Sequence, residues 1–342
     1  MLEHGGGLRA AAIHYGIPLS DWLDVSTGIN PQGWPVPLLP PTAWQRLPEI
    51  GDGLEDAAAA YYGTAQLLPV AGSQAAIQTL PLLRERGQVG VLYPGYAEHA
   101  HAWRRAGHEV EMLPVEALEG AVDRLDVLAL IHPNNPTGQR FERATLLDWR
   151  ARLAVRGGWL VVDEAFMDAT PEDSLAGEAG LPGLIVLRSL GKFFGLAGAR
   201  VGFVMAESAV LERLQEALGP WAVSGPARWV AMQALKDRDW QAQMRVDLRQ
   251  AEERLQEILQ RQRLPVAGGT ALFQWVSLPE AEYWQEALAQ RGILVRRFAD
   301  PPGLRFGLPG AESAWQRLAL ALAEMCSERS NRCGELNHGI EL

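Results

Sequence analysis

Three polar side chains in this 342-residue sequence stand at or just after the ends of short apolar runs. Asn135 follows the run at residues 127–131, Asp163 ends the run that begins at Trp159, and Lys192 follows residues 184–187. Short runs of this composition are typical of buried strands. A lone lysine after a strand would be an ordinary solvated residue. An amine, a carboxylate and an amide at three strand ends indicate one shared site.

These three groups suit an aldehyde cofactor that carries a pyridine ring and a phosphate. Such a cofactor needs an amine to form a Schiff base, a carboxylate to keep the ring nitrogen protonated, and a donor near the ring oxygen. Lys192, Asp163 and Asn135 can fill these roles in that order. A buried ion pair with a pyridinium would also explain an aspartate at the end of an apolar strand, where an unpaired charge is costly.

Other residues could hold the ring and the phosphate. Tyr96 is a candidate for stacking on the ring face. A turn of small residues at 71–76 precedes a helical pattern, and a helix start offers N–H groups and a positive dipole end to an anion. A plain helix cap is the alternative for that turn. The predicted phosphate ligands are Gly72, Ser73, Gln74, Ser189 and Arg200.

Helical and strand patterns alternate from residue 52 to residue 204. Predicted strands lie at residues 89–93, 109–113, 127–131, 159–162, 184–187 and 201–204, and predicted helices at 52–62, 96–106 and 145–155. Uniformly apolar strands separated by helices indicate an α/β protein with a mainly parallel sheet covered on both faces. Ligands of such sheets bind beyond the carboxyl ends of the strands, where the polar residues fall.

The chain divides into a large domain and a smaller one. A charged helical pattern at residues 240–262 predicts a connecting helix, and strands at 271–278 and 293–298 with helices at 280–290 and 313–325 predict a smaller C-terminal α/β domain. The predicted division is an N-terminal arm at residues 1–40, a large cofactor-binding domain at 41–235, a small domain at 236–327 and a disordered tail at 328–342.

Composition excludes several classes of protein. A formal net charge of −10 without a basic tract argues against nucleic acid or an anionic membrane as partner. No apolar run reaches the roughly 20 residues of a membrane helix, and residues 1–12 lack the pattern of a secretory signal. The two cysteines, Cys326 and Cys333, exclude a disulfide framework and lack, with His338, the spacing of a zinc site. A cytoplasmic protein without a bound metal is expected.

Four ordered motifs resemble the pyridoxal-phosphate enzymes of the class I/II aminotransferase family, fold type I. They are Asn135-Pro136-Thr137-Gly138, Asp163-Glu164-Ala165-Phe166, Ser189-Leu190-Gly191-Lys192 and Arg200-Val201-Gly202. The resemblance extends from about residue 30 to about residue 320. It implies that Lys192 is the Schiff-base lysine, Asp163 the partner of the pyridine nitrogen and Asn135 the residue on the 3′ oxygen. It also implies a homodimer with active sites at the subunit interface.

Two branches of that family are similar to this chain, the histidinol-phosphate aminotransferases and the threonine-phosphate decarboxylases. The decarboxylases share an opening His4-Gly5-Gly6 and a stretch with the pattern Asp-x-Ser-x-x-Ile-Asn-Pro-x-Gly, here residues 24–33. Phe166 also stands where the aminotransferases usually have a tyrosine. Leu47 departs from the aminotransferase branch, in which a tyrosine usually reaches the phosphate of the neighbouring subunit.

The decarboxylase branch implies conversion of L-threonine O-3-phosphate to (R)-1-amino-2-propanol O-2-phosphate for cobalamin biosynthesis. Arg305 matches the family's carboxylate arginine, while Arg296 or Arg297 with His4 is the expected phosphate site, and Asn30 is a further substrate contact. Surface salt bridges are the alternative for the arginines. An aminotransferase of histidinol phosphate or an aromatic amino acid is the alternative reaction. A non-enzymatic relative would lack Lys192, Asp163 or Asn135, and all three are present.

Overall fold

The chain folds into two compact units. The computed structural model describes residues 4–338, with side chains for residues 4–328. The large unit is Gln32–Asp247, and the small unit combines the described parts of Glu3–Pro31 and Leu248–Leu342. These units divide after Pro31 and Asp247, whereas the predicted domain boundaries fall after residues 40 and 235. The difference at the N-terminus arises because strand β1 (Leu23–Asp24) pairs with β11 (Ile293–Leu294) of the small unit.

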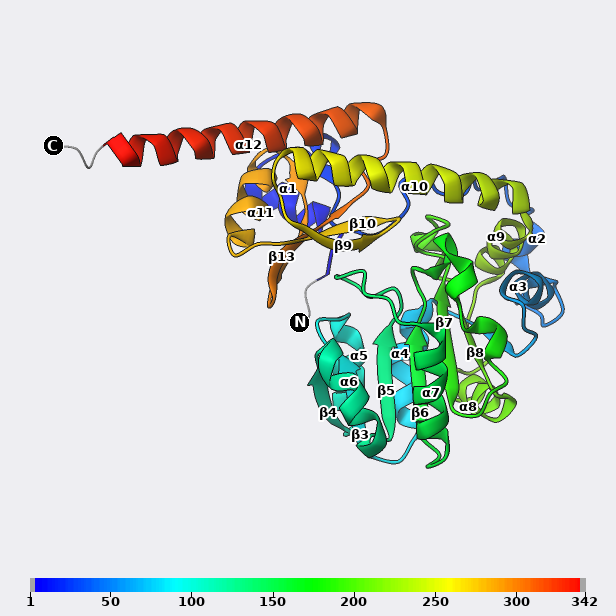
Figure 1. Ribbon diagram of the computed structural model, residues 1–342. Coiled ribbons are helices and arrows are strands. Elements are labelled where there is room, and N and C mark those ends of the chain that lie inside the picture. The colour runs from blue at the N-terminus through cyan, green and yellow to red at the C-terminus, as the bar shows by residue number, and fades with distance from the viewer. Residues whose placement is uncertain (1–3, 339–342) are drawn as a thin grey trace. The chain divides into compact units, whose positions relative to one another are not determined.

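A seven-stranded sheet forms the centre of the large unit (Figure 1). Its order is β2 (Leu67–Val70), β8 (Gly202–Ala206), β7 (Leu184–Ser189), β6 (Trp159–Asp163), β5 (Val127–Ile131), β3 (Gln88–Leu92) and β4 (Glu109–Leu113). The strand pairs from β7 to β4 are parallel, and only β8 runs antiparallel to its two neighbours. The predicted mainly parallel α/β sheet is therefore confirmed. Strand β2, which was not predicted, contains Pro69 and lies at the sheet edge, where proline is tolerated.

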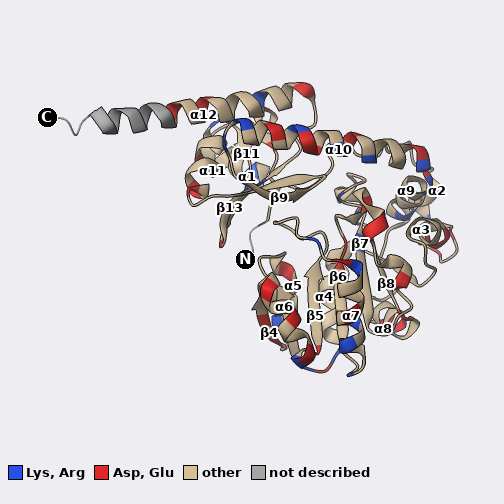
Figure 2. Ribbon diagram, in the orientation of Figure 1, with Lys and Arg blue, Asp and Glu red and all other residues tan. Residues whose placement is uncertain are grey.

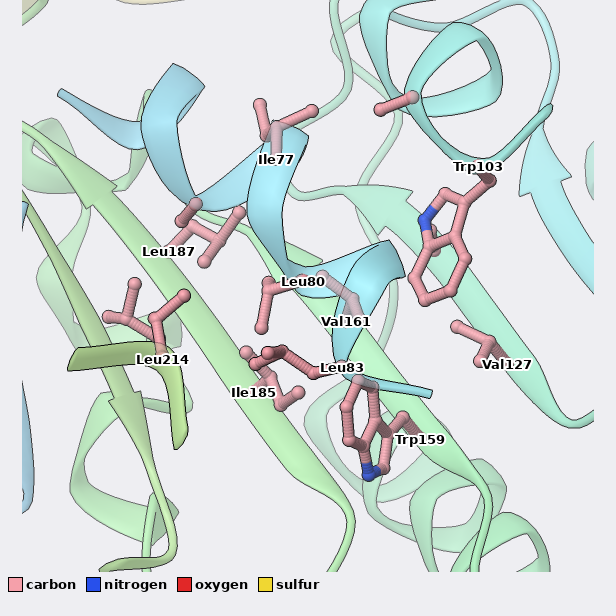
Figure 3. Close-up of a cluster of buried hydrophobic side chains, with 14 of the residues drawn as sticks. Ile77, Leu80, Leu83, Trp103, Val127, Trp159, Val161, Ile185, Leu187 and Leu214 are labelled. Atoms are coloured by element: carbon pink, nitrogen blue, oxygen red, sulfur yellow. The ribbon is translucent and has the colours of Figure 1, made fainter. Parts of the chain in front are cut away.

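Helices cover this sheet on both faces, with α7 in front and α4 behind in Figure 1. Alternate residues of a strand point to opposite faces, and every residue of β5, β6 and β7 is buried. Ile185 and Leu187 pack with Ile77, Leu80 and Leu214 in the cluster of Figure 3. The helices of the large unit are α2 (Thr42–Gln45), α3 (Leu54–Tyr62), α4 (Ser73–Thr79), α5 (Ala97–Arg105), α6 (Val115–Ala121), α7 (Arg143–Ala154), α8 (Ser208–Leu218) and α9 (Gly225–Lys236).

The small unit contains an antiparallel sheet of order β12 (Arg296–Ala299), β13 (Pro302–Gly307), β10 (Phe273–Ser277) and β9 (Val266–Thr270). The single strand predicted at residues 293–298 is thus divided into β11 and β12. Strand β13 was not predicted, because Pro301-Pro302-Gly303 reads as a turn. The helices of this unit are α1 (Leu8–Tyr15), α11 (Ala281–Gln290) and α12 (Glu312–His338).

Helix α10 (Arg238–Arg261) contributes residues to both units, as expected of a connecting helix. Basic and acidic residues alternate along it (Figure 2). Helix α12 continues through much of the segment predicted to be disordered from residue 328, while residues 339–342 lie outside the described part of the chain. Among the described residues, no helix is long and apolar enough to span a membrane, and no group of three or more His, Cys, Asp or Glu side chains could hold a metal ion. The side chains of Cys333 and His338 are not described.

Candidate active site

Three neighbouring strands of the large unit end at the same level. Asp163, the last residue of β6, is paired in register with Ile131 at the end of β5 and with Leu187 near the end of β7. Asn135 lies four residues beyond Ile131, and Lys192 lies three residues beyond the end of β7. The carboxyl ends of these parallel strands therefore bring together the three segments that carry the predicted amide, carboxylate and amine.

Asp163 is a buried carboxylate, only 3% exposed. Its Oδ2 lies 3.0 Å from Nε2 of His99, and its Oδ1 accepts a hydrogen bond of 3.0 Å from the backbone N–H of Ala165. His99 lies on α5 and is itself buried. His99 is a residue that was not predicted from the sequence. Its position three residues after Tyr96 could have indicated it, because residues three apart share one face of a helix.

Tyr96 is half-buried beside His99, with their ring centroids 6.3 Å apart. Its hydroxyl donates a 3.1 Å hydrogen bond to Oε1 of Gln74, and Nε2 of Gln74 donates a 2.8 Å bond to Glu98. Burial, with added repulsion from Glu98 and Asp163, raises the pKa of Tyr96 to about 12, so its hydroxyl remains a proton donor. The side chain of Gln74 therefore orients the ring, and its backbone N–H is the group that could reach a phosphate.

Lys192 lies on the turn that follows β7. Its Nζ is 5.5 Å from the ring centroid of Phe166, which is buried three residues beyond Asp163. The sequence contains only one other lysine, Lys236, which is exposed at the end of α9. Arginine does not lose its proton in proteins, so Lys192 is the side-chain amine of this sheet edge that could react with an aldehyde.

An anion cradle lies at the start of α4. Gly72 has φ +74, and a Cβ atom there would lie 2.5 Å from Nη2 of Arg200, so the guanidinium rests against this glycine. A Cβ on Gly202 would lie 2.6 Å from the backbone nitrogen of Ser73, and Gly202 is the register partner of Ser189. The segments that carry Ser73, Ser189 and Arg200 are thus adjacent, and their N–H, hydroxyl and guanidinium donors suit a phosphate.

Asn135 lies on a loop that is tied to the segment before Tyr96. The side chain of the preceding Asn134 donates 2.8 Å hydrogen bonds to the carbonyl of Pro94 and to the hydroxyl of Thr137. Asn135 itself is half-buried. The large unit therefore presents an amine, a buried carboxylate, an amide, an aromatic ring and an anion cradle, and this donor set fits pyridoxal phosphate.

Two arginines of the small unit stand directly opposite each other across a pair of strands. Arg296 of β12 is the register partner of Arg305 of β13. Arg305 is buried and donates a 2.6 Å hydrogen bond from Nη2 to the carbonyl of Ser26. Burial and the charge of Arg296 lower the pKa of Arg305 to about 10. Like charges at opposed positions destabilise a sheet, so a bound anion would relieve this repulsion.

A polar cavity of about 190 Å³ in the same unit is lined by His4, residues 5–7, Ser26, Gln285, Leu294, Val295, Arg296 and Arg297. The backbone N–H of Gly6 donates a 2.7 Å hydrogen bond to the Ser26 hydroxyl, and Gly5 is so close to the Ser26 carbonyl that no Cβ fits there. These contacts place His4 in the same cavity as Arg296 and Arg297. Asn30 is buried in this unit but does not line the cavity.

A buried ion cluster beneath the site was also not identified from the sequence. Arg188 of β7 lies 2.9 Å from Glu164 and also pairs with Asp168, and all three are at most 1% exposed. Burial opposes the charge of Arg188, but its two carboxylate partners outweigh it and raise its pKa. The position of Arg188 inside an otherwise apolar strand could have indicated this cluster. Removing one partner would leave a buried charge uncompensated.

Gly72→Ala should weaken cofactor binding. The added Cβ would press on the Arg200 guanidinium at a backbone conformation that favours glycine, so we expect the dissociation constant for pyridoxal phosphate to rise about tenfold or more. Absorbance titration of the apoprotein measures this. Gly63→Ala is the control, because Gly63 also has a positive φ of 77 but has open space around it. Equal affinities in the two variants would contradict the assigned cradle.

His132, buried at the end of β5, should make folding sensitive to acid. Burial, with a contribution from Arg140, lowers its pKa to about 4, so between pH 6.5 and 4 the unfolded chain binds the proton and the folded chain does not. The free energy of unfolding therefore keeps its full value above pH 6.5. It decreases as the pH falls, by roughly 3 kcal/mol at pH 4. Urea unfolding at several pH values measures how the free energy of unfolding depends on pH. This dependence should be weaker in His132→Asn and unchanged in the exposed His101→Asn. Identical slopes in all three proteins would refute it.

The chain is similar to known proteins along most of its length. It is 58% identical to a threonine-phosphate decarboxylase from Pseudomonas aeruginosa, over 94% of this chain and 97% of the relative. It is 43% identical to a protein of the same name from Sinorhizobium sp, over 95% and 98% of the two chains. A histidinol-phosphate aminotransferase from Escherichia coli is 35% identical over 44% of this chain and 45% of its own.

Solved structures share the fold. The histidinol-phosphate aminotransferase of Sinorhizobium meliloti, in complex with pyridoxal-5'-phosphate, matches with a TM-score of 0.82 at 19% identity, covering 94% of this chain and 95% of its own. The L-threonine-O-3-phosphate decarboxylase of Porphyromonas gingivalis matches with a TM-score of 0.76 at 20% identity, covering 89% and 99%. Residues 45–325 match the family described as aminotransferase class I and II, and the chain belongs to that family.

Proposed function

We propose that this protein is a pyridoxal-phosphate-dependent decarboxylase that converts L-threonine O-3-phosphate into (R)-1-amino-2-propanol O-2-phosphate and carbon dioxide, for cobalamin biosynthesis. The proposal rests mainly on the opposed pair Arg296 and Arg305, which lies beside a cavity lined by His4 and Arg297. Threonine phosphate carries a carboxylate and a phosphate on one molecule, which such cations can hold. The similarity to threonine-phosphate decarboxylases over nearly the whole chain supports the same reading.

The cofactor-binding residues are those of the large unit. When bound, pyridoxal phosphate supplies an aldehyde carbon for covalent attachment of amino groups and a ring that accepts the electron pair of a bond broken at the substrate's α-carbon. Asp163, supported by His99, holds a proton on the ring nitrogen, and Asn135 donates to the ring oxygen. Tyr96 would pack on the ring face. The phosphate would be held by Gly72, Ser73, the backbone of Gln74, Ser189 and Arg200.

The substrate-binding residues belong to the small unit. Arg305 offers a bidentate fork to the substrate carboxylate, while Arg296, Arg297 and His4 hold the phosphate. We propose that Asn30 also contacts the substrate. Residues that fix both anions would decide which bond at the α-carbon is positioned to break.

Lys192 completes the reaction. When the bond between the α-carbon and the carboxyl carbon breaks, carbon dioxide leaves and the electron pair remains on the α-carbon side. The Nζ of Lys192 then delivers a proton to the α-carbon, which gives the amine product. The proton moves from an amine that the turn after β7 holds near the ring of Phe166.

We also propose that the protein is a homodimer. Several large apolar side chains of the large unit are exposed, among them Trp44 at 70%, Leu47 at 63%, Ile50 at 82% and Trp221 at 58%. Two adjoining cavities, of about 320 and 220 Å³, share Pro48, Glu49 and Arg228 in their walls. Grouped apolar side chains of this size are typical of surfaces that a second copy covers.

The reaction is tested with threonine phosphate and no keto-acid acceptor. We expect the wild type to release carbon dioxide and Lys192→Ala to release none. Arg305→Met should lower kcat/KM about 100-fold, or about 3 kcal/mol, because a charge-assisted interaction with the carboxylate is lost. Carbon dioxide and amine are measured directly. Strict dependence on 2-oxoglutarate would instead identify an aminotransferase, for which histidinol phosphate is the substrate to test.

The dimer is tested by size-exclusion chromatography with light scattering. We expect the wild type to elute as a dimer and Leu47→Glu combined with Trp221→Glu to elute as a monomer, because two charges would be buried in the interface. Leu82→Glu is the control, since Leu82 is 69% exposed but lies outside this surface. A monomeric wild type, or a dimer that the double substitution leaves intact, would contradict the proposal.

A further inference from the structure

The turn that carries Lys192 is held by residues from two distant parts of the large unit. We propose that Trp34, Asp237 and Trp240 form a clamp that positions Lys192 without touching the reacting atoms. This inference rests on the proposed role of Lys192 but is tested without the reaction. We refer to these three side chains as the lysine clamp.

The turn itself is short and closed by backbone hydrogen bonds. The N–H of Gly195 donates a 3.1 Å bond to the carbonyl of Lys192, and the N–H of Leu196 donates a 3.2 Å bond to that of Leu190. Phe193 and Phe194, the two residues after Lys192, are fully buried. Whatever fixes these two rings therefore fixes the backbone from which the Lys192 side chain extends.

The segment containing Trp34 makes the first contact with this turn. The backbone N–H of Trp34 donates a 2.8 Å hydrogen bond to the carbonyl of Phe194. Gly33 packs so closely that a Cβ atom would lie 3.2 Å from the Cα of Gly195 and from the Phe194 carbonyl oxygen. The glycine that ends the Asp-x-Ser motif thus permits close approach to the lysine turn.

One carboxylate joins this segment to the start of α10. Oδ2 of Asp237 accepts a 2.9 Å hydrogen bond from the indole N–H of Trp34, which is only 7% exposed. Oδ1 of Asp237 accepts a 3.1 Å bond from the backbone N–H of Trp240, which is the geometry of a helix N-cap. The same side chain therefore caps α10 and holds Trp34.

Trp240 closes the clamp by packing on both phenylalanines. Its ring stacks on Phe194 with centroids 5.6 Å apart and an interplanar angle of 18°, and meets Phe193 edge-on at 5.5 Å. The guanidinium of Arg245, five residues further along α10, lies 5.5 Å from the Phe193 ring. The two residues after Lys192 are thus held from the Trp34 side and from the α10 side.

If these side chains only packed the core, replacing them would change the stability of the fold and leave the reactivity of Lys192 unchanged. A lysine side chain is flexible, with about 2 kcal/mol of rotamer entropy, and the position of its backbone sets the region that Nζ can reach. Loosening the turn should change the reactivity of Lys192 as well as the stability of the fold. The chain makes this measurable, because Lys236 is its only other lysine and is exposed.

The test compares Trp34→Phe with Trp149→Phe. Trp34→Phe keeps an aromatic ring and removes the indole bond to Asp237. Trp149 is a matched control, because it is 4% exposed and its indole donates a 2.6 Å bond to Glu119 on another part of the large unit. Each apoprotein is treated with a limiting amine-selective acylating reagent, and peptide mass spectrometry gives the ratio of Lys192 to Lys236 modification. Asp237 is left unchanged because it adjoins Lys236.

We expect Trp34→Phe and Trp240→Leu to change this ratio by about threefold or more, and Trp149→Phe to leave it at the wild-type value. The pH midpoint of the absorbance of bound pyridoxal phosphate should shift in the same two variants. If Trp240→Leu fails to fold, the conservative Trp34→Phe alone decides. Wild-type ratios and midpoints in both clamp variants, with thermal stability lowered as in the control, would overturn the proposal. Failure of carbon dioxide release by the wild type would overturn only the reaction.

Discussion

The site of the large unit depends on one constraint, the burial of the Asp163 carboxylate at the carboxyl end of β6. A buried charge is costly unless it is paired and hydrogen-bonded. His99 and the backbone N–H of Ala165 meet two of its lone pairs, and they fix the direction in which it points. The strand order places β5 and β7 on either side of β6. The segments that carry Asn135 and Lys192 therefore begin on either side of the strand that ends at Asp163. A cationic ring nitrogen is the natural partner for this carboxylate.

The small unit has the complementary constraint, an excess of positive charge. Arg296 and Arg305 are opposed across β12 and β13, and the buried Arg305 has a lowered pKa. Such a pair is retained against its electrostatic cost when it binds an anion. We propose that a cationic cofactor pairs with the buried carboxylate and an anionic substrate with the opposed arginines, which would link the stability of each unit to its ligand.

Much of the large unit was predictable because its strands are apolar on both faces. Strands β5, β6 and β7 lie where the sequence predicted them, and Asp163 and Lys192 lie at or just after the ends of these strands. Strands β2 and β13 were missed because proline within or before them masks the pattern. Their pairing is long-range, and only the sheet as a whole reveals it. Helix α12 also extends further than its apolar pattern.

The supporting residues were harder to find, since their roles depend on contacts between distant parts of the chain. His99 and Arg188 are ordinary in sequence and become significant only beside Asp163 and Asp168. Gln74 was expected to bind phosphate, but its side chain hydrogen-bonds Tyr96 and Glu98. Trp34 and Asp237 are separated by about two hundred residues and meet at the lysine turn. No local pattern encodes such pairs.

We propose that Asp163 holds a proton on the ring nitrogen of the cofactor. The most direct measurement is the ¹⁵N chemical shift of pyridoxal phosphate labelled at the ring nitrogen and bound to the protein. We predict a protonated nitrogen in the wild type at neutral pH and an unprotonated one in Asp163→Asn, which has a similar shape without the charge. An unprotonated nitrogen in the wild type, or no difference between the two proteins, would show that Asp163 does not have this role.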